Sequence, residues 1–273
     1  MRDFLQLLQH LAQAPAVLVT VARTQGSVPR EAGAWLAVCG AVELGSIGGG
    51  RLEFEALAHA RQLLARGAPV PDETRRYPLG PSLGQCCGGM VELHYQRVDA
   101  ADVEALRARL APAATPLALF GGGHVGRAIV RLLADLPFAV RWIDSRDEVF
   151  PPDVPPHVVC EHSDPVQAAV AELAPGSVVL VMSFSHAEDL LIVAACLARQ
   201  RARGDLPYIG LIGSRTKWAV FRRRLLARGF TEDELTAVTC PVGLPTITGK
   251  QPAVVAVSVV AQLLQLGLAP GAA

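Results

Sequence analysis

The stretch Leu117-Ala118-Leu119-Phe120-Gly121-Gly122-Gly123-His124-Val125-Gly126 decides the fold that we expect for this chain. Four apolar residues lead directly into a Gly121-x-Gly123-x-x-Gly126 pattern at the start of an amphipathic segment. Glycines at this spacing permit a tight strand-to-helix turn and let a pyrophosphate approach the N–H groups of the helix. Asp144 comes 18 residues after Gly126, at the end of the next apolar run, where a ribose-binding acid belongs. The stretch therefore predicts a Rossmann-type domain.

Two questions stay open at this motif. The fold can persist without a bound dinucleotide, because a fold does not fix a function. His124 within the motif, and Arg146 beside Asp144, leave open whether the cofactor would be NAD, NADP or another nucleotide.

Downstream of this stretch, apolar strand-like runs alternate with segments of helical periodicity. We expect strands at 117–120, 139–143, 157–160, 178–182 and 208–212, and helices at 125–135, 165–173, 187–201, 216–227 and 252–266. Such alternation is typical of a doubly wound parallel sheet.

Upstream of it the pattern is α+β. Helices are expected at 3–13 and 51–65, and strands at 16–21, 34–38, 74–77 and 90–98. A small-residue segment with two prolines separates the two halves and reads as a linker. We therefore expect an α/β protein with an α+β domain at 1–110, a linker at 111–116 and a Rossmann-like doubly wound parallel-sheet domain at 117–273.

The composition excludes several classes of protein. Of the 273 residues 51% are hydrophobic and 18% charged, which is unlike a disordered chain. The 25 Lys and Arg residues balance 25 Asp and Glu residues, so charge gives no support to a nucleic-acid partner. Residues 253–268 are apolar, but Ser258, Gln262 and Gln265 interrupt them and they are too short to span a bilayer comfortably. We expect a buried closing helix there and no membrane partner.

Six cysteines are scattered along the chain without the spacing of a zinc site or a disulfide framework, which fits a reducing, cytoplasmic location. Cys39, Cys160 and Cys196 lie in apolar patterns and are expected in the core, while the place of Cys240 stays open. Cys86 and Cys87 stand in Gln85-Cys86-Cys87-Gly88-Gly89, where N–H dipoles of a glycine-rich loop would favour a thiolate. The alternative is a pair of buried cysteines acting as small apolar residues.

A second glycine-rich motif precedes the helix expected at 51–65. In Gly45-Ser46-Ile47-Gly48-Gly49-Gly50-Arg51, consecutive glycines can aim N–H groups at an anion, and Arg51 adds positive charge. The alternative is a turn with close backbone packing. We favour binding of an anion or cofactor by Gly48, Gly49, Gly50 and Arg51.

Two further loops follow strands at the edge where such sheets bind ligands. His186 follows the strand at 178–182 and could bind a ligand, transfer a proton or merely neighbour a helix cap. Ser214, Arg215 and Lys217 follow the strand at 208–212, where helix N–H groups and the two cations make a plausible phosphate contact.

An ordered set of these motifs resembles the XdhC/CoxI family of xanthine dehydrogenase accessory proteins over nearly the whole chain, from about residue 18 to 264. The set comprises Gly26-Ser27-Val28-Pro29-Arg30, residues 45–50, Cys87-Gly88-Gly89, residues 120–126, Ser185-His186, residues 210–215 and residues 243–250. The resemblance implies a chaperone that binds molybdenum cofactor (molybdopterin), holds it while a cysteine desulfurase supplies the terminal sulfur, and delivers it to apo-xanthine dehydrogenase. It also implies an XdhC/CoxI-type N-terminal domain, and molybdenum cofactor biosynthesis proteins as further partners. We expect a homo-oligomer.

This implied function agrees with the chemistry of the motifs. A phosphate-bearing pterin with a dithiolene-held metal calls for anion-binding N–H groups and suits a soft thiolate. Cys87 matches the family's cysteine before the double glycine, so we assign it the metal contact, with Cys86 as the neighbouring candidate. The cofactor-binding set is completed by residues of the other motifs: Gly48, Gly49, Gly50, Arg51, Gly88, Gly89, Gly121, Gly123, His124, Gly126, Asp144, His186, Ser214 and Arg215.

No catalytic residue is assigned. The alternative function is an NAD(P)-dependent oxidoreductase that uses the C-terminal domain, but its sequence offers no Tyr-x-x-x-Lys or comparable acid–base set. A protein-interaction adaptor without any small ligand is a further, weaker alternative.

Overall fold

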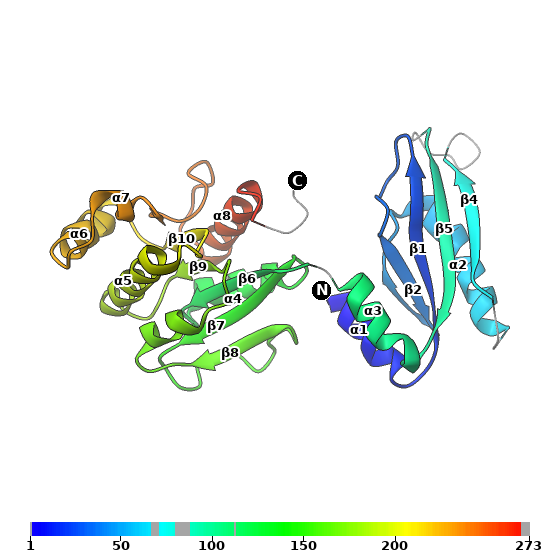
Figure 1. The fold of residues 1–273 in the computed structure, drawn as a ribbon, viewed down its shortest axis with the longest axis horizontal. Coiled ribbons are helices and arrows are strands. Elements are labelled where there is room, and N and C mark those ends of the chain that lie inside the picture. Colours follow the sequence, from blue (N-terminus) through cyan, green and yellow to red (C-terminus); the bar gives the residue numbers. More distant parts are fainter. Residues whose placement is uncertain (1, 67–70, 80–87, 112, 269–273) are drawn as a thin grey trace. The chain divides into compact units, whose positions relative to one another are not determined.

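The computed structural model describes residues 2–66, 71–79, 88–111 and 113–268. The chain consists of two compact units, unit 1 at residues 1–111 and unit 2 at residues 112–273 (Figure 1). The predicted segment containing Cys86 and Cys87 lies outside the described residues.

Unit 1 is built on a five-stranded antiparallel sheet with the order β3-β2-β1-β5-β4. Its strands are β1 (Ala16–Gln25), β2 (Trp35–Cys39), β3 (Val42–Gly45), β4 (Glu73–Pro78) and β5 (Met90–Val98). Its helices are α1 (Arg2–Leu11), α2 (Gly50–Ala65), the 3₁₀ turn η2 (Ala100–Asp102) and α3 (Val103–Leu110).

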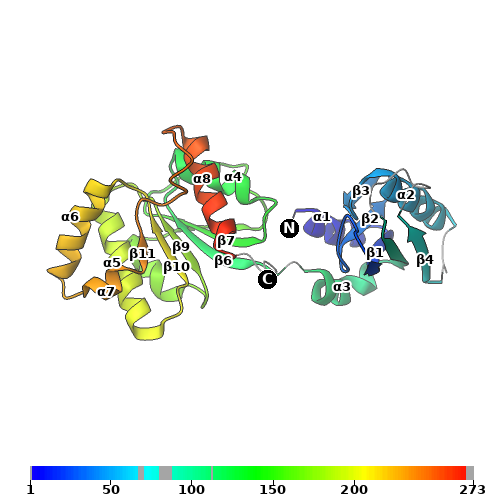
Figure 2. The ribbon, with the colours of Figure 1, turned by 90° about the horizontal axis from the view of Figure 1, so that it is seen from above.

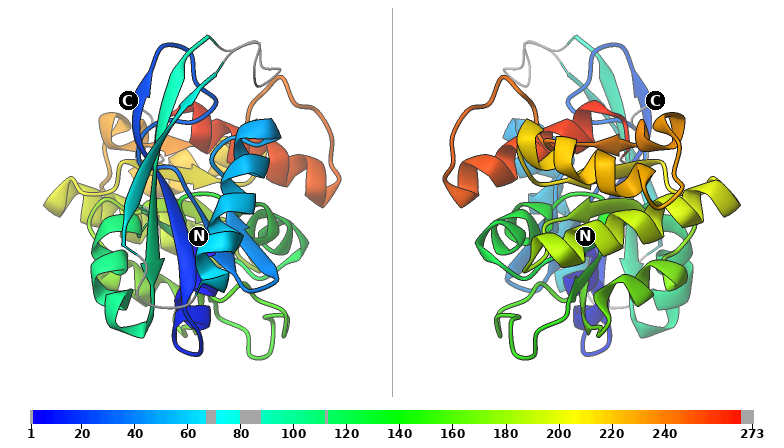
Figure 3. Two further views of the ribbon diagram at one scale, coloured as in Figure 1. Left: turned by 90° about the vertical axis from the view of Figure 1, so that its right-hand side faces the viewer. Right: turned by 90° about the vertical axis from the view of Figure 1, so that its left-hand side faces the viewer.

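Both faces of this sheet are covered, and the period-2 alternation of β1 explains why. Val17, Val19 and Val21 point to one face, where they join α2 in a buried cluster. Ala16 and Leu18 point to the other face, where they join α1 and α3. The left view of Figure 3 shows β1 and β5 side by side with α2 along the sheet. The first part of β1, residues 16–21, is therefore nearly continuously apolar, because helices cover both of its faces, whereas Ala22, Arg23 and Gln25 are exposed.

Unit 2 is a six-stranded parallel sheet with the order β11-β10-β9-β6-β7-β8, the order of a Rossmann fold. Its strands are β6 (Thr115–Phe120), β7 (Phe138–Asp144), β8 (Val158–His162), β9 (Val178–Val181), β10 (Tyr208–Leu211) and β11 (Val238–Thr239). Its helices are α4 (His124–Leu133), the 3₁₀ helix η3 (Val166–Glu172), α5 (His186–Arg203), α6 (Arg215–Leu226), α7 (Glu232–Leu235) and α8 (Pro252–Gln265).

The helices of unit 2 form one layer on each face of the sheet (Figure 2). On one face α4 and α8 pack on Leu117, Leu119 and Leu180. On the other face η3, α5, α6 and α7 pack on the alternate residues of the same strands, such as Phe120. The right view of Figure 3 shows that second face from the front, with α5 in yellow-green. This arrangement confirms the doubly wound α/β fold that the sequence predicts.

The structure adds to the predicted elements and changes some of their types. Five short elements were not predicted: β3, η2, α3, α7 and β11. The segment expected as a helix at 165–173 is a 3₁₀ helix, and β6 begins at Thr115, inside the predicted linker. Pro116 is tolerated there because it pairs only with β7, while pairing with β9 starts at Leu117.

One prediction about the core was wrong. Cys160 is exposed, although Cys39 and Cys196 are buried as expected. Cys160 lies on β8, which is an edge strand of the sheet, and its neighbour Val159 is also exposed. An apolar strand pattern does not reveal whether its strand is central or at an edge.

The apolar C-terminal helix is α8, and it buries Ala256, Val259 and Leu263 against unit 2. None of the helices within the described residues combines the length and the apolar character needed to cross a membrane.

Candidate functional site

The loops after β6 and β9 touch at the carboxyl edge of the parallel sheet, where the strand order reverses. A Cβ on Gly121, whose φ is +125°, would lie 2.0 Å from the carbonyl oxygen of Met182. A Cβ on Gly126 would lie 2.1 Å from the carbonyl oxygen of Gly121. These two glycines of the motif are thus required by the packing of the turn itself. Ligands of such sheets bind at this reversal of strand order.

Gly123, the middle glycine of the motif, has space around it. Among the described residues, no heavy atom outside its chain neighbours lies within 4 Å of the position that a Cβ would take. Gly123 is the N-cap of α4, it supplies no side-chain cap, and the first turn of α4 has no acidic residue. His124, the first residue of α4, is exposed. The first turn of α4 can therefore receive an anion, which agrees with the predicted role of Gly123 and His124 without testing it.

Asp144, the predicted ribose acid, is buried at the end of β7 and fully hydrogen-bonded. Its Oδ2 accepts the N–H of Gly122 at 2.6 Å and the Nη2 of Arg146 at 2.9 Å. Its Oδ1 accepts the backbone N–H and the Nε of Arg146, both at 2.9 Å. Burial would raise the pKa of Asp144, but these hydrogen bonds lower it below its ordinary value. The carboxylate is therefore ionised and already has four donors.

The guanidinium of Arg146 is held by two contacts. Besides its ion pair with Asp144, its guanidinium stacks over the exposed ring of Phe184, 4.6 Å from the centroid. The hydrogen bond to Asp144, and the negative charge of Glu188, raise the pKa of Arg146. Glu188 accepts a hydrogen bond from the Ser145 hydroxyl at 2.7 Å. Within the described residues its other oxygen, Oε2, is buried without a hydrogen-bond partner.

The first turn of α5 anchors two neighbouring loops through Asp189. The buried Asp189 carboxylate accepts the N–H of Ser183 at 2.8 Å and the Nζ of Lys217 at 2.5 Å. Lys217 also donates to the carbonyl oxygen of Ile212 at 2.8 Å and lies over the ring of Phe221. The pair thus joins the loop after β9, the helix α5 and the loop after β10.

The other predicted residues of this edge take structural positions. Ser185 caps α5, and the exposed His186 beside it meets the ring of Phe221 edge-on at 6.5 Å. Ser214 caps α6, its hydroxyl accepting the N–H of Lys217, and Arg215 is exposed at the helix start. Cys240 is half-buried near Gly213, and burial raises the pKa of its thiol to about 11. It is therefore protonated at neutral pH.

In unit 1, three glycine-containing segments meet at one end of the sheet. A Cβ on Gly26 would lie 3.2 Å from the Cα of Gly89, and a Cβ on Gly89 would lie 2.4 Å from the carbonyl oxygen of Ser27. A Cβ on Gly48, whose φ is +119°, would lie 2.5 Å from the Cβ of Pro29. Residues 26–30 therefore contact both the loop 45–50 and Gly88-Gly89.

Glu53, in the first turn of α2, accepts hydrogen bonds from N–H groups of the loop 45–50. Its Oε2 accepts the hydroxyl of Ser46 at 2.7 Å, the N–H of Ile47 at 2.9 Å and the N–H of Gly49 at 3.1 Å. Burial would raise the pKa of Glu53, but these bonds lower it. An external anion at Gly49, one of the predicted binding residues, would have to displace this carboxylate. The predicted Arg51 is exposed and paired with Glu55.

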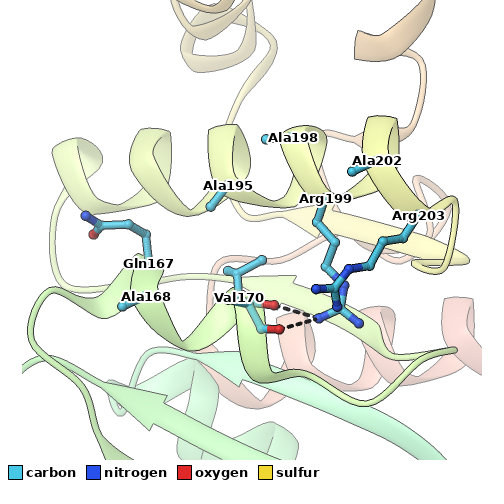
Figure 4. A pocket seen from close by; sticks show the side chains of 9 residues that line it. Gln167, Ala168, Val170, Ala195, Ala198, Arg199, Ala202 and Arg203 are labelled. Atoms are coloured by element: carbon cyan, nitrogen blue, oxygen red, sulfur yellow. Dashed lines mark hydrogen bonds between the residues drawn. The ribbon is translucent and has the colours of Figure 1, made fainter.

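A pocket of about 360 Å³ between η3 and α5 lies outside both sets of loops (Figure 4). Alanines line much of it, and Arg199 is its buried charged residue. The Arg199 guanidinium donates to the carbonyl oxygens of Val170 and Leu173 and to Asp205. Arg199 therefore joins η3 to α5 and has its donors engaged within the protein.

The structure thus assembles the predicted residues into two groups, one in each unit, without testing their roles. Unit 1 brings together Gly48, Gly49, Gly50, Arg51, Gly88 and Gly89, and unit 2 brings together Gly121, Gly123, His124, Gly126, Asp144, His186, Ser214 and Arg215. Sequence reasoning missed the supporting carboxylates Glu53 and Asp189. It predicted Lys217 as one of two cations for a phosphate, whereas the ammonium of Lys217 is bound to Asp189 and to the carbonyl oxygen of Ile212.

Comparisons with known proteins agree with this two-unit architecture. A family model described as the XdhC Rossmann domain matches residues 117–263, and one described as the XdhC and CoxI family matches residues 10–78. The uncharacterized protein YqeB of Escherichia coli K12 is 28% identical over 262 residues, which are 94% of this chain and 44% of YqeB. The chain therefore spans less than half the length of that relative.

A crystal structure from Bacillus halodurans, described as a xanthine dehydrogenase, superposes with a TM-score of 0.73. The match covers 97% of this chain and 96% of the other at 22% sequence identity. At that identity, the likeness shows that the two proteins share the complete two-unit fold.

Proposed function

The chain belongs to the XdhC family, and from that premise we propose that it is a xanthine dehydrogenase accessory protein that binds and delivers molybdenum cofactor. In this role it holds the cofactor while a cysteine desulfurase supplies the terminal sulfur, and then passes it to the apo-enzyme. The cargo is a pterin with a phosphate and a dithiolene-held metal. A protein that carries it needs access for a flat ring, cations for the phosphate and a soft ligand near the metal.

The observation that carries the proposal is the meeting of residues 26–30, the loop 45–50 and Gly88-Gly89 in unit 1. These segments are three of the motifs on which the family resemblance depends, and they are far apart in the sequence. Among the described residues, nothing lies within 4 Å of a Cβ placed on Gly49 or Gly88. A flat pterin ring can therefore approach the backbone at these two positions.

Positive charge stands beside this group of loops. Arg30 and Arg51 are both exposed, and the Cγ of Arg30 would lie 3.3 Å from a Cβ on Gly48. We assign the cofactor phosphate to these arginines rather than to the N–H groups of Ile47 and Gly49, which Glu53 occupies. Cys87, adjacent to Gly88 in the chain, would supply the soft ligand.

The proposal is tested by purifying the full chain from cells that make the cofactor and assaying released pterin as its oxidised fluorescent derivative. We expect pterin well above the amount that copurifies with an unrelated protein of similar size. Pterin at the level of that control would rule out cofactor binding. An Arg30→Ala variant should retain less pterin than an Arg23→Ala control, whose arginine lies on β1.

The thiol assignment is tested with Cys87→Ser and Cys86→Ser as a matched pair. A hydroxyl is a poor ligand for a soft metal and stays protonated at neutral pH, so Cys87→Ser should retain about 5- to 150-fold less cofactor. Cys86→Ser should have a smaller effect. Loss of pterin in the Cys86 variant alone would move the assignment by one residue, and normal binding in both would remove the thiol from the site.

A further inference from the structure

We propose that Arg146 closes the carboxyl edge of the parallel sheet to dinucleotides, so that this chain keeps the glycine fingerprint of a dinucleotide site without binding NAD(H). Arg146 would then be the specificity-determining residue of unit 2. The inference concerns a ligand and a unit that the cofactor-delivery proposal does not use, and it stands or falls independently of that proposal.

Asp144 has no capacity left to accept hydrogen bonds from a ribose. In a dinucleotide site, the acid at the end of the second strand accepts hydrogen bonds from the ribose hydroxyls. A carboxylate has about four lone-pair positions. On Asp144 these are taken by the N–H of Gly122, the N–H of Arg146 and two guanidinium donors of Arg146. A ribose diol can bind there only after the guanidinium leaves.

The guanidinium of Arg146 is also held firmly in its place. It makes two parallel hydrogen bonds of 2.9 Å to Asp144, whose side chain is only 1% exposed. Bidentate charge-assisted pairs of this kind are among the strongest hydrogen bonds in proteins. The ring of Phe184 covers the guanidinium at 4.6 Å and adds a cation–π contact. Neutral ribose hydroxyls would replace the charge-assisted hydrogen bonds on the buried Asp144 carboxylate by weaker ones.

The charges around Arg146 also disfavour the phosphorylated ribose of NADP. A guanidinium near the ribose acid can accommodate the 2′-phosphate of NADP. Here Arg146 is already paired with Asp144, and the negative charge of Glu188 also acts on its guanidinium, so two carboxylates oppose this single cation before a phosphate arrives. A 2′-phosphate would meet repulsion from both carboxylates, and we therefore expect neither dinucleotide to bind.

The test is a fluorescence titration of the full chain with NADH and with NADPH. We expect no saturation by either ligand in the wild type up to millimolar concentration. Arg146→Ala keeps the backbone donors of Gly122 and of residue 146 on Asp144 and vacates the other two positions. It should bind NADH at least about tenfold more tightly than the wild type. Adding Asp144→Asn to Arg146→Ala should abolish this gain, because the acceptor for the ribose diol is then lost.

Three results would overturn the proposal. Wild-type protein that binds NADH as tightly as Arg146→Ala would show that the guanidinium is no barrier. Wild-type binding of NADPH that Arg146→Ala loses would show that Arg146 receives a 2′-phosphate. A folded Arg146→Ala variant that gains nothing would show that Asp144 does not limit binding. Arg146→Gln, which retains one donor for Asp144, serves as the second variant if circular dichroism shows that Arg146→Ala is unfolded, and the same gain is expected of it.

Discussion

Glu53 and Asp144 have the same structural role in two unrelated units. Each is a carboxylate that accepts N–H groups of a glycine-rich loop standing before a helix. Such N–H groups attract anions, and a sequence motif shows only that the donors exist. Whether they face a ligand or a carboxylate of the same chain depends on side chains outside the motif. This is why the glycines could be found from sequence and the state of their donors could not.

Replacing Glu53 should destabilise unit 1. Glu53→Ala leaves one hydroxyl and two N–H donors of the loop 45–50 without their acceptor, and we expect a loss of roughly 1–3 kcal/mol in the free energy of unfolding. Glu55→Ala, which removes only an exposed ion pair with Arg51, should change it by about 0.5 kcal/mol or less. Urea denaturation of both variants measures the difference, and equal losses would contradict the role given to Glu53.

The effect of Glu53 should depend on pH. Because the folded-state pKa of Glu53 is lowered, its ionised form contributes stability above its ordinary pKa of 4.5. That contribution is lost as the pH falls from there through the folded-state pKa. The difference between wild type and Glu53→Ala should therefore shrink in acid, and a difference that grows in acid would exclude an ionised Glu53 as its source.

Substitution by alanine should destabilise the protein at Gly121 but hardly change its stability at Gly123. Gly121→Ala places a Cβ 2.0 Å from a carbonyl oxygen at a φ of +125°, so we expect a loss of roughly 2–4 kcal/mol in stability. In Gly123→Ala the new Cβ lies in open space at a φ of −72°, and the free energy of unfolding should stay within about 0.5 kcal/mol of the wild-type value. Thermal unfolding followed by circular dichroism tests this pair, and a stable Gly121→Ala variant would show that the turn can relax.

At the scale of the elements, the Asp189–Lys217 pair fixes the start of α5 to the loop after β10. Both side chains are buried, so removing one leaves the other charge without a partner. Lys217→Met should lower the free energy of unfolding by about 3–5 kcal/mol. Arg222→Met, on the exposed face of α6, should lower it by about 0.5 kcal/mol or less. Adding Asp189→Asn to Lys217→Met should restore part of the loss. Additive losses in the double variant would show that the pair is not coupled.

The elements that the sequence predicted correctly are those whose periodicity runs for two turns or several strand residues. β1, β5 and α5 belong to this group, although β1 extends four residues and α5 two residues beyond the predicted end. Four-residue elements such as α7 carry no periodicity, and its signal is the reciprocal cap between Thr231 and Glu234. The exposure of Cys160 depends on the position of β8 at the sheet edge, and strand order is not contained in the pattern of any one strand.

The candidate sites, too, could be predicted from the sequence only where the signal lies within one short motif. The glycine positions in both units were identifiable because glycine has few reasons to recur at fixed spacing. Pairs such as Asp189 and Lys217 are 28 residues apart and meet only because β9 and β10 are neighbours in the sheet. Chemistry that depends on such meetings follows from topology, which the sequence indicated only as a class.

At the scale of the whole molecule, each unit has its own core. The buried clusters of unit 1 and those of unit 2 share no residue, and each unit contains its own sheet with helices packed on both faces. We expect residues 112–273, expressed alone, to fold with a cooperative thermal transition within a few degrees of that of unit 2 in the full chain. A fragment without such a transition would show that unit 2 depends on unit 1.

Cys39 and Cys196 give this division a practical consequence. One lies in the core of unit 1 and the other in the core of unit 2, and burial raises the pKa of the two thiols to about 11 and about 12. A thiol-reactive reagent can modify either one only during an opening of the unit that contains it. Alkylation followed over time at the level of single peptides would then give two opening rates in one experiment, one for each unit. The exposed Cys160, which reacts without any opening, supplies the reference rate.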